Sequence, residues 1–185
     1  MKAVYIISDN QYFALGAAAL IKHQQAIIVS PEELLNQNPG INSGDCYIFV
    51  RNRVLHRRLC CYLKQTNCNL IFFLPGLRYR SGTKLLPCFW PARISAKSFR
   101  ERSAQVARYF SRSCPENTTL SGRARMSMAA AGLERYMRWV RARSISHQAA
   151  HSHHRALIKT VGIENVSIHT LFLSEYIAAS HIALS

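Results

Sequence analysis

The chain has 185 residues, of which 49% are hydrophobic and 18% are charged, so it suits one ordinary domain or two small ones with a packed core and argues against wholesale disorder. Its 24 Lys and Arg outnumber its 9 Asp and Glu and give a formal net charge of +15, which favours a polyanionic partner, above all nucleic acid. An ordinary basic surface or an anionic membrane partner is the alternative explanation, because charge alone defines no specific site.

The first 110 residues alternate short apolar runs with helix-forming segments, in the pattern of repeated strand–helix–strand units. We expect strands and helices in turn at 3–8, 12–22, 26–30, 31–37, 46–50, 54–65 and 69–75, then a fifth strand within 87–97 and a helix at 98–110. Because continuous apolar strands alternate with helices, we predict an α/β domain at 1–110 with a parallel sheet covered on both faces.

The rest of the chain has a different composition. Residues 111–119 are polar, contain a proline and show no apolar period, which is typical of a linker. From residue 120 the chain is rich in Ala, Arg and Met with helical spacing, so we predict a small all-α domain at 120–185. Its eight basic residues all fall within 123–159, where Glu134 is the one acid, so positive charge is concentrated there.

Several classes of protein are disfavoured. The six cysteines include no CxxC pair and no secretory signal precedes them, so we expect reduced thiols in a cytoplasmic protein. No apolar run approaches the roughly 18 residues of a membrane-spanning helix, and we expect no membrane partner. The sequence holds no Gly-rich phosphate loop, no GxSxG and no paired acids, so we expect neither an enzyme nor a bound cofactor.

Residues 145–165, with the sequence ISHQAAHSHHRALIKTVGIEN, contain four of the eight histidines. Ala150, Leu157 and Val161 are spaced by seven and four residues and form one apolar helical face, and Gly162 follows as a good C-cap. A recognition helix has this layout, because one face packs on its domain and the other enters the major groove of DNA. We therefore predict that the helix around 146–161 contacts DNA.

The same histidines allow two other interpretations. His147, His151 and His154 lie at i, i+4 and i+7 on one helical side, and imidazole is a common ligand of zinc and nickel. No nearby cysteine or carboxylate completes such a set, apart from Glu164 beyond the glycine. The histidines can also be surface residues without any role. We favour the DNA-contacting helix and predict no metal site.

The segment 120–173 resembles the helix-turn-helix domain of bacterial transcriptional regulators of the LuxR/NarL type. His153 matches the family's histidine, Leu157 and Val161 match its two apolar positions, and GIEN at 162–165 matches its G-[VI]-x-[NS] ending. The chain departs from the family pattern in the first helix, where LSGRAR lacks the usual Glu, and at the position of a phosphate-contacting Thr, where it has Ala149.

The resemblance implies roles for individual side chains. It directs His151, Ser152 and Arg155 towards base edges, where an arginine can bridge O6 and N7 of guanine. It places Gln148 and Lys159 near the backbone phosphates. The preceding basic helix would add salt-sensitive, non-specific contacts through its arginines, namely Arg138, Arg141 and Arg143.

The α/β pattern ahead of such a motif resembles the receiver domains of response regulators. A phosphoryl-accepting receiver needs an acidic pair after the first strand, an Asp ending the third, a Ser or Thr ending the fourth and a Lys ending the fifth. Here Asp9 is one acid, Arg51 lies where the third strand ends, Pro75 ends the fourth, and Lys97 alone matches. Without an acceptor carboxylate and with too little charge for Mg²⁺, the domain is predicted to be a pseudo-receiver that regulates by protein contact. A turn or N-cap role explains Asp9 equally well.

These patterns together predict a DNA-binding transcriptional regulator that is not controlled by phosphotransfer. Its partner would be double-stranded DNA, bound as a homodimer or as a heterodimer with another regulator, because such motifs commonly contact paired half-sites. The alternative is an adaptor whose degenerate helix-turn-helix contacts another transcription factor, which the missing Thr and Glu favour.

Overall fold

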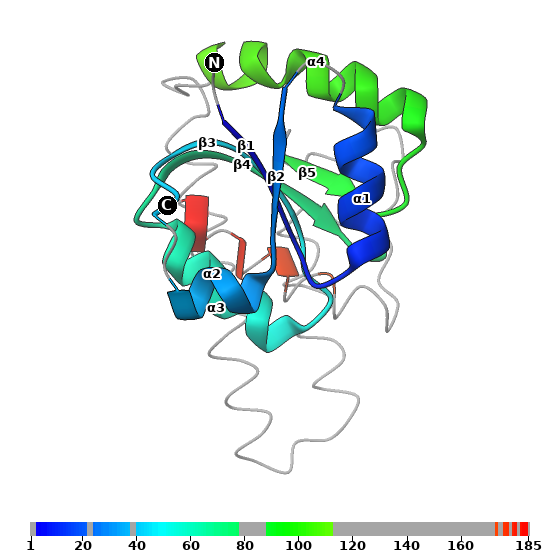
Figure 1. Cartoon of the computed structure of the whole chain (residues 1–185). Helices are drawn as coiled ribbons and strands as arrows, with labels where there is room; N and C mark the ends of the chain where they lie inside the picture. The colour runs from blue at the N-terminus through cyan, green and yellow to red at the C-terminus, as the bar shows by residue number, and fades with distance from the viewer. Residues whose placement is uncertain are drawn as a thin grey trace, which may run out of the picture.

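The computed structural model describes residues 3–21, 24–37, 40–77 and 88–112, together with eight helical residues between Leu173 and Leu184. Five strands form one parallel sheet in the order β2-β1-β3-β4-β5 (Figure 1). The strands are β1 (Val4–Ser8), β2 (Ala26–Val29), β3 (Ser43–Phe49), β4 (Asn67–Leu74) and β5 (Phe89–Pro91). The predicted α/β fold with a parallel sheet is confirmed, and its strand order is consistent with a receiver-like domain.

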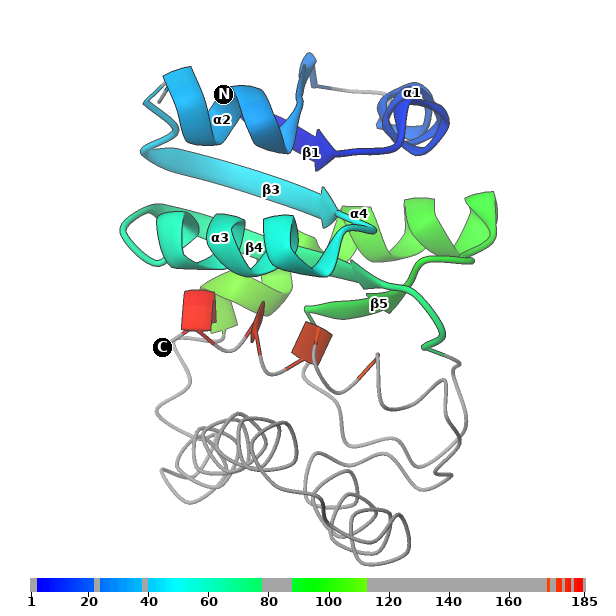
Figure 2. The same ribbon diagram turned by 90° about the horizontal axis from the view of Figure 1, so that it is seen from below.

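Helices cover both faces of this sheet (Figures 1 and 2). They are α1 (Gln11–Leu20), α2 (Pro31–Gln37), α3 (Arg53–Leu63) and α4 (Ala96–Arg112). Buried side chains of α1 and α4 form one core cluster with one face of the sheet, and those of α2 and α3 form a second cluster with the other face. Alternation along the strands separates the clusters, since Cys46 and Ile48 join the second and Tyr47 and Phe49 the first.

Each helix follows its apolar spacing and has a recognisable start. In α3 the leucines at 55, 59 and 63 are buried while Arg57 and Arg58 are exposed, which is the one-sided pattern of a helix on a sheet. The Asn10 side chain accepts a hydrogen bond from the Phe13 N–H at 3.0 Å and caps α1. Asn52 does the same for α3.

Strand β3 begins at Ser43, earlier than the expected residue 46, because the turn-like sequence before it already pairs with its neighbours. Gly44 makes this possible. Its φ is 150°, and a Cβ added to it would meet the Ala3 carbonyl oxygen at 2.6 Å. The Asp45 N–H donates to that same carbonyl at 3.0 Å, so the close approach is part of the sheet.

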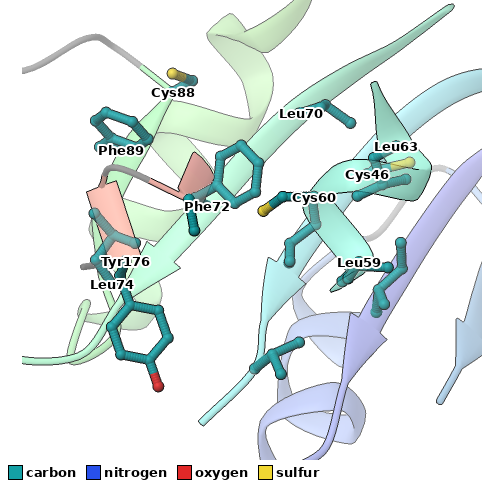
Figure 3. Close-up of a cluster of buried hydrophobic side chains, with 14 of the residues drawn as sticks. Cys46, Leu59, Cys60, Leu63, Leu70, Phe72, Leu74, Cys88, Phe89 and Tyr176 are labelled. Atoms are coloured by element: carbon teal, nitrogen blue, oxygen red, sulfur yellow. The ribbon is translucent and has the colours of Figure 1, made fainter. Parts of the chain in front are cut away.

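A short stretch near the end of the chain belongs to the same core. We call it the C-terminal segment, meaning the described helical residues Leu173, Tyr176, Ile177, Ala179, Ser180, Ile182, Ala183 and Leu184. Leu173, Tyr176, Ile177 and Ala179 are buried in the cluster that contains α3 and one face of the sheet. Figure 3 shows Tyr176 in this cluster. Figure 2 shows the segment beside α3, near β4 and β5. The range 120–185, predicted as a separate domain, therefore includes residues that pack on the α/β domain, while residues 113–172 lie outside the described part of the chain.

Candidate functional site

The edge of the sheet where the parallel strands end at their carboxyl termini is the place to look for a receiver-type site. Asp9 follows β1, Arg51 lies between β3 and α3, and Pro75 follows β4. Parallel strands bring these ends together, and ligands of open α/β sheets bind at this edge. The geometry here decides what Asp9 can do.

Asp9 binds the backbone that follows β3. One carboxylate oxygen of Asp9 accepts from the Arg51 N–H at 2.9 Å, and the other accepts from the Arg51 and Asn52 N–H groups at 2.8 and 3.0 Å. Charge-assisted hydrogen bonds of this kind are stronger than neutral ones. The cap of α1 is Asn10, so Asp9 is not that cap, and it joins two loops that are 42 residues apart in sequence.

The same peptide is held from its other side by the C-terminal segment. The Tyr176 hydroxyl donates a hydrogen bond to the Arg51 carbonyl oxygen. Asn52, the next residue, uses its side-chain oxygen to accept from the N–H groups of Val54 and Leu55 at 3.0 and 3.2 Å. The loop from β3 to α3 is thus fixed by Asp9, by Tyr176 and by the Asn52 cap. We call the contacts of Asp9 and Tyr176 with the backbone of Arg51 and Asn52 the Asp9–Arg51–Tyr176 corner.

The hydrogen bonds of this corner have a structural role, because they join the loop after β1 to the loop after β3. The carboxylate of Asp9 accepts hydrogen bonds from backbone N–H groups of the loop that follows β3. The loop after β3 offers Arg51 and Asn52 where a receiver has its acceptor carboxylate. Within the ranges that the structure describes, no three His, Cys, Asp or Glu side chains are grouped so that they could hold a metal ion.

A second polar contact ties α3 to the C-terminal segment. The Nε2 atom of His56 lies 3.0 Å from the Ser180 hydroxyl, which itself donates to the Tyr176 carbonyl at 2.8 Å. His56 is buried, and burial lowers its pKa to about 4, although the Tyr176 carbonyl and the Asp9 carboxylate act weakly in the opposite direction. The imidazole is therefore neutral at pH 7, and its Nδ1 atom has no hydrogen-bond partner among the residues that the structure describes.

The five described cysteines form no disulfide bond and lie in different environments. Cys46, Cys60 and Cys88 are buried, whereas Cys61 is exposed on α3. Burial raises the pKa of Cys60 well above its ordinary range and that of Cys88 to about 12. Because the thiolate is the reactive form, these two buried thiols act as small apolar core residues.

Lys97 does not end the fifth strand, and the prediction that it matches the receiver lysine is wrong. Strand β5 ends at Pro91, and Lys97 is the exposed second residue of α4. The reason is the cap at Ser95, whose side-chain oxygen accepts from the Ser98 N–H at 3.2 Å and starts α4 two residues earlier than expected.

The residues predicted to contact DNA all lie outside the described residues. They are Arg138, Arg141, Arg143, Gln148, His151, Ser152, Arg155 and Lys159. The alternative metal ligands His147, His151 and His154 lie outside them too. The predictions about these side chains therefore stay predictions.

Sequence reasoning missed the role of Tyr176, Ser180 and His56. A signal was present, because Leu173, Tyr176, Ile177, Ser180 and Leu184 recur at helical spacing and indicate one buried face. The spacing does not say what that face packs against, since a helix can bury it on any neighbouring element. His56 was likewise hidden inside an ordinary amphipathic pattern.

Comparison with protein-family models, with curated proteins and with solved structures found no match for this chain. None of the helices formed by the described residues combines the length and the apolar character that crossing a bilayer requires.

Proposed function

We propose that the chain is a transcriptional regulator that binds double-stranded DNA through the segment around 146–161 and is regulated through its α/β domain by protein contact. The observation that carries the proposal is the order of two regions along the chain. A parallel sheet with the strand order β2-β1-β3-β4-β5 precedes a basic segment that resembles the LuxR/NarL-type helix-turn-helix. The net charge of +15 supports a polyanionic partner.

The proposed division of labour within the DNA-binding segment follows side-chain chemistry. Arg155, Ser152 and His151 would contact base edges, because guanidinium, hydroxyl and imidazole groups match donors and acceptors in the major groove. Lys159 and Gln148 would contact phosphates, with the arginines at 138, 141 and 143 adding to the non-specific attraction.

Control without phosphotransfer is the second part of the proposal, and the hydrogen bonds of Asp9 support it. A receiver needs carboxylates free to bind Mg²⁺, whereas Asp9 already accepts from the Arg51 and Asn52 N–H groups, and Arg51 adds positive charge beside it. The signal would then arrive as a partner protein that contacts the α/β domain.

The DNA proposal is tested by selecting genomic fragments that the full chain retains and then measuring affinity on the selected site and on random DNA at several salt concentrations. Arg155→Ala should weaken specific binding by about 1–3 kcal/mol and leave random DNA nearly unaffected. Lys159→Ala is the matched control, because loss of a phosphate contact should weaken both DNAs alike and lower the salt slope by about one. Equal losses for Arg155→Ala on both DNAs would remove it from the base contacts.

The regulatory proposal is tested by incubating the chain with acetyl phosphate and Mg²⁺ and measuring its intact mass, beside a phosphorylatable receiver as positive control. We expect no adduct on this chain. A labile phosphoryl adduct would overturn the proposal.

An adaptor is the second candidate, and Ala149 favours it, because the family's threonine at this position contacts a phosphate and alanine cannot. The two candidates differ in what the isolated chain does. A regulator retains specific fragments alone, whereas an adaptor retains them only when its partner transcription factor is added.

A further inference from the structure

The described residues along one edge of the α/β domain are mostly apolar and uncharged. We call it the α1–β2 edge, meaning the described residues 11–21 and 24–30, none of which has a charged side chain. Of the five large hydrophobic side chains exposed among the described residues, four lie here, namely Tyr12 (90% exposed), Leu15 (53%), Ile27 (46%) and Ile28 (44%). Single exposed hydrophobic side chains are ordinary, but a concentration on one edge is typical of an interface.

Helix α1 presents a continuous face to solvent. Ala14 and Ala17 are buried against the sheet, while Tyr12, Leu15 and two small residues, Gly16 and Ala19, are exposed at helical spacing. A Cβ added to Gly16 would meet no heavy atom within 4 Å, so the space above it is open. Small residues at this position allow another backbone to approach closely.

Strand β2 is an edge strand of the described sheet. In the described sheet it is the terminal strand and pairs with β1 alone. Proteins usually protect such an edge with charged side chains or cover it. Here Ile27 and Ile28 alternate to the two faces of the sheet, and both are exposed.

We propose that the α1–β2 edge is where two copies of this chain associate, with a twofold axis that sets β2 antiparallel to the β2 of the second copy. Charge is compatible with this occupant, because two chains that each carry +15 repel one another over most of their surface, whereas the described residues of this edge place no cations opposite each other. A twofold interface must be complementary to itself, which an uncharged apolar face is and a basic face is not.

Sheet and helix dimensions agree with this arrangement. Neighbouring strands lie about 4.8 Å apart, and α1 contacts both β1 and β2, so a helix centred over these two strands lies about 5 Å from the axis. The α1 helices of two copies are then about 10 Å apart on the same face of a continuous sheet, within the usual helix packing distance of about 8–10 Å. Tyr12 and Leu15 would pack between them.

Sedimentation of the full chain over a wide concentration range, without DNA, tests the proposal. The wild-type chain should sediment as a dimer, and Leu15→Arg should raise the dissociation constant at least about tenfold, because the twofold axis brings the two new cations close together. Val54→Arg is the matched control. It adds the same charge at another exposed hydrophobic residue, 72% exposed on α3, and should leave association unchanged.

Hydrogen exchange gives a second readout that a merely unstable variant would not imitate. The backbone amides of β2 should exchange more slowly at high protein concentration, while those of the interior strand β3 should not depend on concentration. A wild-type chain that is monomeric throughout, or a dimer that Leu15→Arg and Val54→Arg weaken equally, would overturn the proposal. Since DNA is absent, these outcomes are independent of DNA binding.

Discussion

The two faces of the sheet are covered by different elements and stabilised by different interactions. On the face covered by α1 and α4, the aromatic rings of Phe13, Tyr47, Phe73, Trp90 and Phe99 form contacting pairs whose centroids lie 4.8 to 6.3 Å apart. On the other face, α2 and α3 are joined by the C-terminal segment, which adds polar contacts between residues 124 and 125 positions apart. One face depends on apolar burial among the domain's own helices and strands, and the other also depends on directed hydrogen bonds to a distant part of the chain.

This difference has energetic consequences. Burial of aromatic rings stabilises the fold without requiring a defined partner, and edge-to-face ring pairs add further stabilisation. The polar contacts of the other face require defined partners and protonation states, because a buried group that loses its partner is costly. Substitutions on the two faces should therefore change the free energy of unfolding by different amounts, and these changes should depend differently on pH.

The aromatic face should give the largest effect. Phe73 is 1% exposed and its ring contacts those of Phe13, Tyr47, Trp90 and Phe99. Phe73→Ala should lower the free energy of unfolding by about 3–5 kcal/mol through lost burial and a cavity, measured by urea unfolding. The exposed variant Leu15→Ala should change it by less than about 0.5 kcal/mol at a concentration where the chain is monomeric. A loss for Phe73→Ala below about 1 kcal/mol would contradict this account of the face.

On the opposite face, the C-terminal segment should matter for the whole domain. Ile177 is fully buried, and Ile177→Ala should cost about 2–4 kcal/mol in the same experiment, with one cooperative transition. Leu184→Ala, at a partly buried position of the same segment, is the control and should cost less. If Ile177→Ala leaves unfolding unchanged, the segment does not share the core.

The polar face should also make stability depend on pH through His56. Its folded pKa of about 4 lies below the ordinary 6.5, so the unfolded chain binds a proton more readily between these values. The stability contributed by neutral His56 is complete above pH 6.5 and is lost as pH falls towards 4, by up to about 3 kcal/mol. Urea unfolding at pH 7 and 4.5 should show this loss in the wild-type chain and a smaller one in His56→Phe. Identical pH profiles would exclude His56 as the cause.

The smallest expected effect is that of one hydroxyl group in the Asp9–Arg51–Tyr176 corner. Tyr176→Phe keeps the buried ring and removes the hydrogen bond to the Arg51 carbonyl, so it should cost about 1 kcal/mol. Tyr12→Phe removes a hydroxyl from a 90% exposed side chain and should change stability by only a few tenths of that amount. Equal effects of the two variants would show that the Tyr176 hydroxyl contributes nothing specific.

The sequence predicted the strand and helix order well because each strand contains a short apolar run and the helices repeat their apolar residues at helical spacing. It could not predict that Asp9 binds the Arg51 and Asn52 N–H groups, because such a bond depends on how two distant loops meet. It also could not place Tyr176 and Ile177, since periodicity identifies a buried face without identifying its partner. The side chains predicted to contact DNA lie outside the described residues, so the chemistry of that site depends on the resemblance and on experiment.

The burial of the C-terminal segment changes how the predicted DNA-contacting residues are connected. The chain passes from α4, on one face of the sheet, into residues 113–172 and returns at Leu173 to the core on the opposite face, so both ends of this stretch are anchored on one domain. Closing a loop of this length costs entropy that the contacts of Leu173, Tyr176 and Ile177 must offset. A single backbone cut anywhere in 113–172 would leave those contacts alone to hold the last helix in place.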